Sequence, residues 1–237
     1  MDPSVHVDHL RADSAALLAA HAANPFAAVP SCPGWDRTDL LAHVASVHSW
    51  MRAQVEAGPA ERIRMSTTPR PPEGPELPAW FETNAAGTAL ALSSMDTTVP
   101  WPTWAGPQPG TFYPRRLAQE TAVHRWDAGG GPIDAALAAD GVDELLEVFA
   151  GLVPTERLAG ATGTIHLHAT DAPGEWLLHL GPDGISFERH HAKGDAALRA
   201  AAADLLLWSW NRLPIDDRFE VFGDAALLHL WPRAVSV

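Results

Sequence analysis

The chain has 237 residues, 46% of them hydrophobic, enough to form one large domain or two small ones around a substantial core. Its 16 basic and 29 acidic residues give a net charge of -13, which argues against nucleic acid and anionic membrane surfaces as partners. Cys32 is the only cysteine, which excludes an intrachain disulfide and cysteine-built metal clusters. Any bound metal must therefore be held by histidine and carboxylate side chains.

The N-terminal segment MDPSVHVDHLRADSAALLAA is interrupted by charges and lacks the basic and apolar regions of a secretion signal. No later stretch reaches the roughly 18 apolar residues that a membrane span requires. We therefore expect a cytoplasmic protein.

Helical spacing of leucine, alanine and other apolar residues recurs along the first part of the chain. Asp36 or Thr38 can cap the second predicted helix, and Gly58 ends it. The glycine run after Ala128 ends the fourth. A domain of four or five helices is thus predicted over residues 1–153, with helices at residues 6–23, 37–57, 80–95, 114–128 and 133–153.

Two proline-rich segments, residues 59–78 and 96–113, interrupt these helices and have no periodic pattern. We expect both to be surface loops that border a site. The second contains Trp101, Trp104 and Phe112 just before the fourth helix, where aromatic side chains are suited to line a pocket.

The pattern changes after Pro154, where TGTIHLHAT and GEWLLHLGPDGISFERH alternate apolar and polar residues, as strands do. The Gly-Pro-Asp-Gly sequence between two such runs fits a hairpin turn. Residues 196–213 are predicted to form a helix, and FEVFGDAALLHLW a short strand or turn followed by a last helix. Residues 154–237 are therefore predicted to form a small α+β domain, and the whole chain belongs to the α+β class.

Three side chains in the predicted bundle have the types and spacing of a metal site. Glu120 and His124 are four residues apart, which places them on one face of a helix, and His43 lies on the second helix. Three protein ligands would leave a coordination position open for water or substrate. Asp39 and Asp127 lie about one turn from the two histidines and are candidates to orient them. Ordinary packing of unrelated histidines remains the alternative explanation.

Other reactive side chains receive plainer interpretations. His48 should point away from His43 because five residues turn a helix by about 140°. Cys32 is interpreted as a small apolar residue, since lone cysteines usually are. His166 and His168 share one face of a predicted strand, a spacing that can bind metal, although a solvated strand face also explains it.

The runs CPGWDRTDLLAHVASVHSW, QETAVHRWDA and DLLLWSWNRLPIDDRFEVFGD resemble the mycothiol-dependent maleylpyruvate isomerase family. The resemblance covers nearly the whole chain. It implies a DinB-like four-helix bundle followed by a small α+β domain similar to sterol-carrier proteins. The family's metal ligands, a histidine in an AHVA segment and the glutamate and histidine of an E-x-x-x-H segment, match His43, Glu120 and His124.

The resemblance also implies cofactors and a reaction. A divalent metal, usually zinc, would bind the thiol of mycothiol and lower its pKa, so that the thiolate forms at neutral pH. Addition of the sulfur to the activated double bond of a maleylpyruvate-like acid permits rotation, and its expulsion returns the trans isomer. A thiolate that instead stayed attached to an electrophilic metabolite would make the protein an S-transferase. Both activities stay open, and both require a small electrophilic substrate.

Arg212 corresponds to an arginine that the family places near the active site, often after a glycine where this chain has Asn211. It would anchor a carboxylate of the substrate or cofactor. The residues that bind the thiol cofactor are not predicted. The other alternative is a non-catalytic binding protein in which the metal only braces the bundle.

Overall fold

The computed structural model describes residues 1–235 and separates the chain into two compact units, Met1–Pro132 and Ile133–Val237. The sequence predicts a boundary at residue 153, so the position of the boundary differs by one helix. That helix, α5 (Ala135–Val148), packs against helix α6 (Ala202–Ser209) inside the second unit. Helical spacing identifies α5 as a helix, but spacing alone does not say which domain its apolar face will contact.

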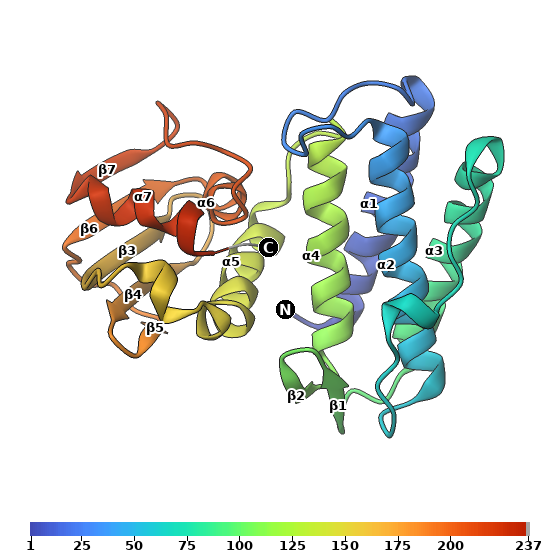
Figure 1. The fold of residues 1–237 in the computed structure, drawn as a ribbon, viewed down its shortest axis with the longest axis horizontal. Helices are drawn as coiled ribbons and strands as arrows, with labels where there is room; N and C mark the ends of the chain where they lie inside the picture. Colours follow the sequence, from blue (N-terminus) through green and yellow to red (C-terminus); the bar gives the residue numbers. More distant parts are fainter. Residues whose placement is uncertain (236–237) are drawn as a thin grey trace. The chain divides into compact units, whose positions relative to one another are not determined.

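The first unit is a bundle of four helices (Figure 1), as the resemblance implies. Proline-containing connectors join the helices at the positions where loops are predicted. α1 packs against α3 and α4, and α2 packs against the same two helices. The bounds are α1 (Pro3–Ala23), α2 (Arg37–Ala57), α3 (Leu77–Ser94) and α4 (Phe112–Asp127).

Local signals fix the start and the end of α2. The side chain of Asp36 accepts hydrogen bonds from the backbone amides of Thr38 and Asp39, and Asp39 in turn accepts from the backbone amide of Asp36. Gly58, with a φ of 86°, ends the helix in a conformation that glycine adopts without strain. The apolar face of α2 is buried in the bundle core, where it contributes Leu40, Leu41, Val44 and Ala45.

Two charged side chains join α4 to its surroundings. Arg125 pairs with the buried Asp13 of α1 at 2.7 Å. Its guanidinium also donates to the backbone carbonyls of Gly130, Gly131 and Pro132, and so holds the glycine-rich segment that follows the helix. Because the Arg125 and Asp13 side chains are buried and their contacts are charged, they hold the end of α4 that carries His124.

The predicted loops contain short regular segments. Residues 59–78 include the 3-10 turns η1 (Met65–Thr67) and η2 (Gly74–Glu76). Residues 96–113, predicted to be irregular, form a two-stranded antiparallel hairpin of β1 (Pro100–Thr103) and β2 (Gly106–Pro109). Prolines obscure this hairpin in the sequence, and edge positions tolerate them because no further strand pairs there.

The second unit contains a five-stranded sheet in the order β5-β4-β3-β6-β7, and the predicted strand signals are confirmed. β3 pairs in antiparallel fashion with β4 and in parallel fashion with β6. Helices α6 and α7 contact both β3 and β6. The further bounds are β3 (Gly163–Ala169), β4 (Glu175–Gly181), β5 (Gly184–Glu188), β6 (Ala196–Ala200), β7 (Glu220–Gly223) and α7 (Ala225–Ala234).

The prediction of one helix over residues 196–213 is wrong in its first part. Residues Ala196–Ala200 form β6, and helix α6 begins only at Ala202. The alanine-rich sequence favours a helix locally, but hydrogen bonding to β3 on one side and β7 on the other decides the conformation.

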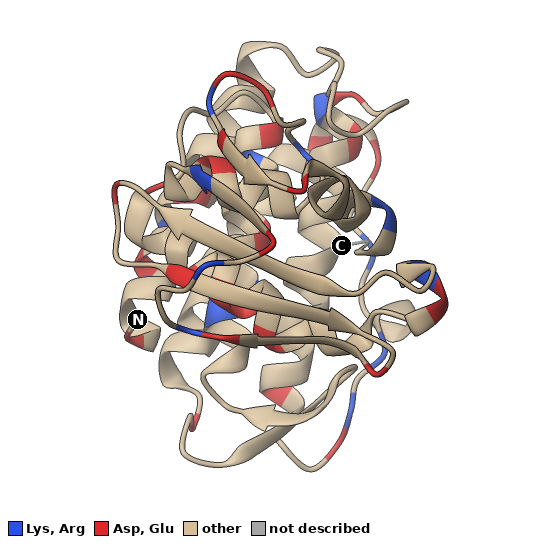
Figure 2. Cartoon of the chain, turned by 90° about the vertical axis from the view of Figure 1, so that its left-hand side faces the viewer, with Lys and Arg blue, Asp and Glu red and all other residues tan. Residues whose placement is uncertain are grey.

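The two faces of the sheet differ in chemistry. Ile165 and Leu167 of β3 are fully buried with the neighbouring core, whereas the alternate residues His166 and His168 lie on the opposite face. Figure 2 colours the charged residues along the ribbon, and some of them lie on the strands of the sheet. Within residues 1–235, no helix combines the length and apolar character needed to cross a membrane.

Candidate metal centre

The bundle brings His43 of α2 together with Glu120 and His124 of α4. Glu120 Oε1 lies 3.2 Å from Nε2 of His43 and 3.2 Å from Nε2 of His124. The two imidazole rings meet nearly edge to face, with centroids 4.9 Å apart. The predicted three residues therefore converge on one point, and their donor atoms are close enough to share a cation.

Asp127 braces His124 from the side away from this point. Nδ1 of His124 lies 2.9 Å from Oδ2 of Asp127, whose other oxygen accepts a 2.6 Å hydrogen bond from the hydroxyl of Ser31. Cys32 lies beside the same carboxylate, with Sγ 3.9 Å from Oδ2. An imidazole that donates from Nδ1 to a carboxylate keeps the lone pair of Nε2 available, which is the usual arrangement of a metal-binding histidine.

Asp39, the other predicted partner, does not have this role. Its carboxylate closes the capping box of α2 and accepts from the Asp36 amide at 3.1 Å. The ring of Trp35 instead lies against His43, with centroids 5.2 Å apart. A carboxylate in the first turn of a helix can cap the backbone or orient a nearby histidine, so sequence spacing alone did not separate the two roles.

Charges around the site favour a bound cation. Burial opposes ionisation of Glu120, yet hydrogen bonds from His124 and His43 and the nearby Arg116 hold its pKa well below the usual range. Burial also disfavours a charged His124, but Asp127 and Glu120 on its two sides raise its pKa to about 9. A proton on His124 and a metal ion would occupy the same negative potential, so metal binding must displace the proton.

Arg116 is a residue that the sequence analysis missed. Its guanidinium lies 3.3 Å from Oε2 of Glu120, one turn earlier on α4. The contact orients the carboxylate so that Oε1 faces the two histidines. The i, i+4 spacing of Arg116 and Glu120 on one helix is the sequence signal that could have identified this contact.

The site is open on the side of His43. Its side chain is 36% exposed, against 16% for Glu120 and 6% for His124. Among residues 1–235, this group contains three potential ligands, not four. A site of this kind leaves room for an external ligand.

Two other predicted residues lie elsewhere. His48 is fully buried and shares a 2.9 Å hydrogen bond with Thr121, in agreement with its predicted structural role. Arg212 belongs to the second unit, where it donates to the carbonyl of Trp210 at 2.9 Å and lies over the Trp210 ring. Asn211 has a φ of 59°, a left-handed conformation open to glycine and asparagine alike, which accounts for asparagine where the family often has glycine. The role of Arg212 in a site stays a prediction.

Two family models together match most of the chain. Residues 7–129 match the family described as the mycothiol maleylpyruvate isomerase N-terminal domain, and residues 136–230 match its C-terminal domain. The chain belongs to the mycothiol maleylpyruvate isomerase family. These two matches meet between residues 129 and 136, close to the boundary of the two structural units.

Two solved structures have a fold similar to that of this chain. A crystal structure of a mycothiol-dependent maleylpyruvate isomerase matches with a TM-score of 0.59 and 15% identity, covering 93% of each chain. A point mutant of a mycothiol-dependent maleylpyruvate isomerase gives a TM-score of 0.58 and 14% identity, again over 93% of each chain. No curated protein matches the chain in sequence. The predicted α+β architecture of a helical bundle and a small mixed domain is confirmed.

Proposed function

We propose that this member of the mycothiol maleylpyruvate isomerase family is a metal-dependent enzyme that uses mycothiol to isomerise a maleylpyruvate-like unsaturated acid. The observation that carries the proposal is the convergence of His43, Glu120 and His124 from helices α2 and α4, with His124 braced by Asp127. Family membership supports the choice of thiol and of substrate class.

The donor set suits a divalent transition metal, and zinc is the proposed ion. Two imidazole nitrogens and one carboxylate oxygen are ligands that zinc accepts, and three of them leave a position for a thiol. When bound, such an ion lowers the pKa of a coordinated thiol, whose reversible addition to the double bond allows rotation about it.

The chain's own residues prepare this chemistry by fixing orientation. Asp127 holds the proton on Nδ1 of His124, which leaves Nε2 directed inward. Arg116 binds Oε2 of Glu120 and leaves Oε1 directed at the two histidines. Arg212 is proposed to bind a carboxylate of the substrate or cofactor through its planar guanidinium.

A structural role for the metal is disfavoured by the number of ligands. A closed structural zinc site has four protein ligands, whereas this group has three among residues 1–235. S-transfer to an electrophilic metabolite would use the same residues and differs only in whether the sulfur leaves. Product analysis therefore separates the two activities.

The test compares untagged wild-type protein with the Glu120→Ala, His124→Ala double variant. Elemental analysis should find more metal in the wild type than in the double variant, by about one ion per chain. With mycothiol present, the wild type should convert the cis acid to the trans acid without consuming thiol. The His9→Ala variant, which removes a histidine of α1 that does not belong to this cluster, should behave like the wild type.

Two results would overturn parts of the proposal. Full isomerase activity in the double variant would exclude this site from catalysis. Stoichiometric consumption of mycothiol, with a stable thioether product, would replace the isomerase by an S-transferase acting through the same residues.

A further inference from the structure

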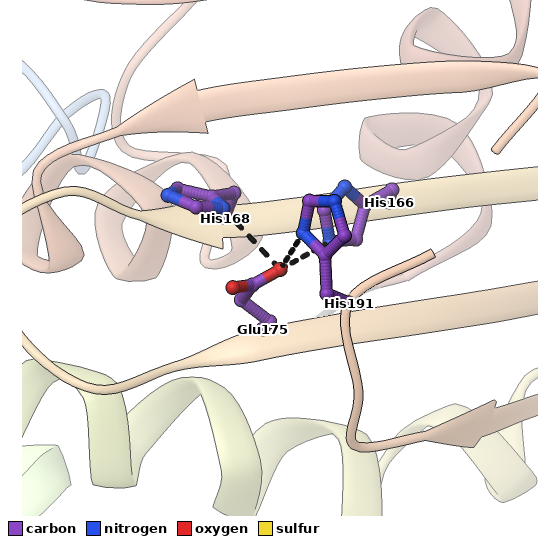
Figure 3. Close-up of side chains that lie close together, drawn as sticks. All are labelled: His166, His168, Glu175 and His191. Carbon is purple, nitrogen blue, oxygen red and sulfur yellow. Dashed lines mark hydrogen bonds and ion pairs between the residues drawn. The ribbon is translucent and has the colours of Figure 1, made fainter. Parts of the chain in front are cut away.

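A second histidine and glutamate cluster lies in the sheet domain (Figure 3). Its members are His166 and His168 on β3, Glu175 on β4 and His191 in the segment between β5 and β6. All four side chains point toward one another in the close-up, and their nearest ligand atoms lie within 4.8 Å of one another. This cluster shares no residue with the bundle site.

Sheet geometry accounts for the convergence of the first three residues. His166 and His168 are two residues apart on β3 and therefore share a face. Glu175 lies directly opposite His168 in the antiparallel register, which places it on that face as well. The helices α6 and α7 contact β3 through its other, apolar face.

The order of the strands in the sheet brings the fourth residue, His191, to the cluster. β5 lies at one edge of the sheet, but β6 lies beyond β4 and β3, so residues 189–195 must cross both strands. Arg189 anchors the start of the crossing at Asp143. Asp195 anchors its end through the amide and hydroxyl of Thr164, both at 2.8 Å. His191 lies between these anchors and reaches the cluster.

The four side chains meet at a single atom, Oε2 of Glu175. Nε2 of His166 lies 3.1 Å from it, Nδ1 of His168 3.3 Å and Nδ1 of His191 2.5 Å. In a tetrahedral zinc site with bonds of about 2.0–2.1 Å, neighbouring ligand atoms are about 3.3–3.4 Å apart. The distances from Glu175 to the three nitrogens thus require only small side-chain rotations to enclose an ion.

We propose that His166, His168, Glu175 and His191 form a second metal site, a closed four-ligand site for zinc or a similar divalent transition metal. Three imidazoles and one carboxylate, without thiolate, suit Zn²⁺, Ni²⁺, Co²⁺ and Cu²⁺, and they suit Mg²⁺ and Ca²⁺ poorly. With four protein ligands, the ion binds structurally and joins the middle of the 189–195 crossing to the sheet.

The side chains of the cluster differ in exposure in a way that lets an ion enter from solvent. His166 is 7% exposed and His168 is 29% exposed, so both are held in the sheet before an ion arrives. The side chain of His191 is 76% exposed and closes the site from the outside. Binding should therefore order the crossing segment more than the strands.

The first test measures metal stoichiometry with the bundle site removed. In the Glu120→Ala, His124→Ala background, titration with Zn²⁺ should reveal one site, and His191→Ala in that background should weaken its affinity at least tenfold. His190→Ala is the matched control, because it removes the adjacent exposed histidine, which lies outside the cluster, and it should leave affinity unchanged. No Zn²⁺ binding in the background protein, or equal losses in both histidine variants, would overturn the proposal.

A second measurement identifies the ligands without relying on affinity. Co²⁺ bound in the background protein should give the intense visible absorption of a tetrahedral ion, and His191→Ala, which changes an exposed side chain, should reduce it while the circular dichroism stays native. Zn²⁺ should also slow amide exchange in residues 189–195 in the same protein. A weak octahedral spectrum with unchanged exchange would indicate adventitious surface binding and refute the site.

Discussion

The helical bundle and the sheet each gather histidines around one glutamate, but they build the cluster differently. In the bundle, two helices supply three donors, and Asp127 and Arg116 brace two of them. In the sheet, two strands and a crossing segment supply four donors, and three imidazoles approach one oxygen of Glu175. The bundle cluster therefore suits an ion that must accept an external ligand, whereas the sheet cluster suits an ion enclosed by protein.

The comparison shows that ligand number and bracing carry more information than histidine content. His124 is 6% exposed and has its Nδ1 committed to Asp127, so its orientation is set before any ion binds. His191 is 76% exposed and lies on a segment without regular structure. A preorganised site costs little reorganisation during a reaction, while a structural site gains its order from the ion.

The Glu120→Gln variant should produce the largest difference in metal affinity between the two clusters. The change removes the anionic donor of the bundle and leaves Arg116 facing a neutral amide, so we expect metal affinity there to fall more than 100-fold, beyond the ~10–100-fold typical for outer partners. Isomerase activity should become undetectable. Competition with a chromophoric chelator should show that the sheet site keeps its ion; equal loss at both sites would contradict two independent centres.

A smaller effect is expected from Asp127→Asn, which keeps the shape of the side chain but removes the charge behind His124. Metal affinity at the bundle site should fall by about 10–100-fold because the imidazole loses its charged partner. Asp39→Asn is the matched control on α2, since Asp39 caps the helix and does not contact His43. Isothermal titration should detect weakening in the first variant alone; parallel losses would mean that both act through helix stability.

Much of the bundle site could be predicted from the sequence because it depends on local regularity. The i, i+4 spacing of Glu120 and His124 fixes their shared face wherever α4 packs. The partnership with His43 required knowledge of which helices are neighbours, and the family resemblance supplied it. Ser31 could not be predicted as a partner of Asp127, because the connector before α2 has no periodic pattern.

Only two of the four residues of the sheet cluster could be predicted from the sequence, because the other two depend on long-range structure. His166 and His168 share a face by strand alternation alone. Glu175 joins them through the register of β3 and β4, and His191 through the order of strands in the sheet. Both are long-range properties, and the single helix predicted over residues 196–213 left out strand β6, which the crossing segment with His191 leads into.

His48 provides a contrast within α2, because it is a buried histidine that belongs to neither cluster. Burial lowers its pKa from 6.5 to about 4, so the folded protein keeps it neutral while the unfolded chain takes up a proton below pH 6.5. The free energy of unfolding of metal-free protein should therefore fall as pH decreases, by about 2 kcal/mol between pH 7 and pH 5 from this group. Above pH 6.5 the group has little effect.

The His48→Gln variant isolates this contribution, since glutamine does not titrate and can still bond to Thr121. Urea unfolding at pH 7 and pH 5 should show a smaller difference in the variant than in the wild type. Its metal content should be unchanged, which distinguishes it from variants of His43. An equal pH dependence in both proteins would assign the acid sensitivity to other groups.

Arg212→Ala should separate chemistry from metal binding altogether, because it should lower turnover without changing metal content. The residue lies in the second unit but outside its histidine cluster, so both sites should retain their ions. Loss of a charged hydrogen bond to a substrate carboxylate costs about 1.5–3 kcal/mol, so kcat/KM should fall at least tenfold. Arg212→Lys should recover only part of this loss because lysine cannot make the planar two-point contact. Unchanged kcat/KM with intact metal content would leave Arg212 with the structural role suggested by its contacts to Trp210.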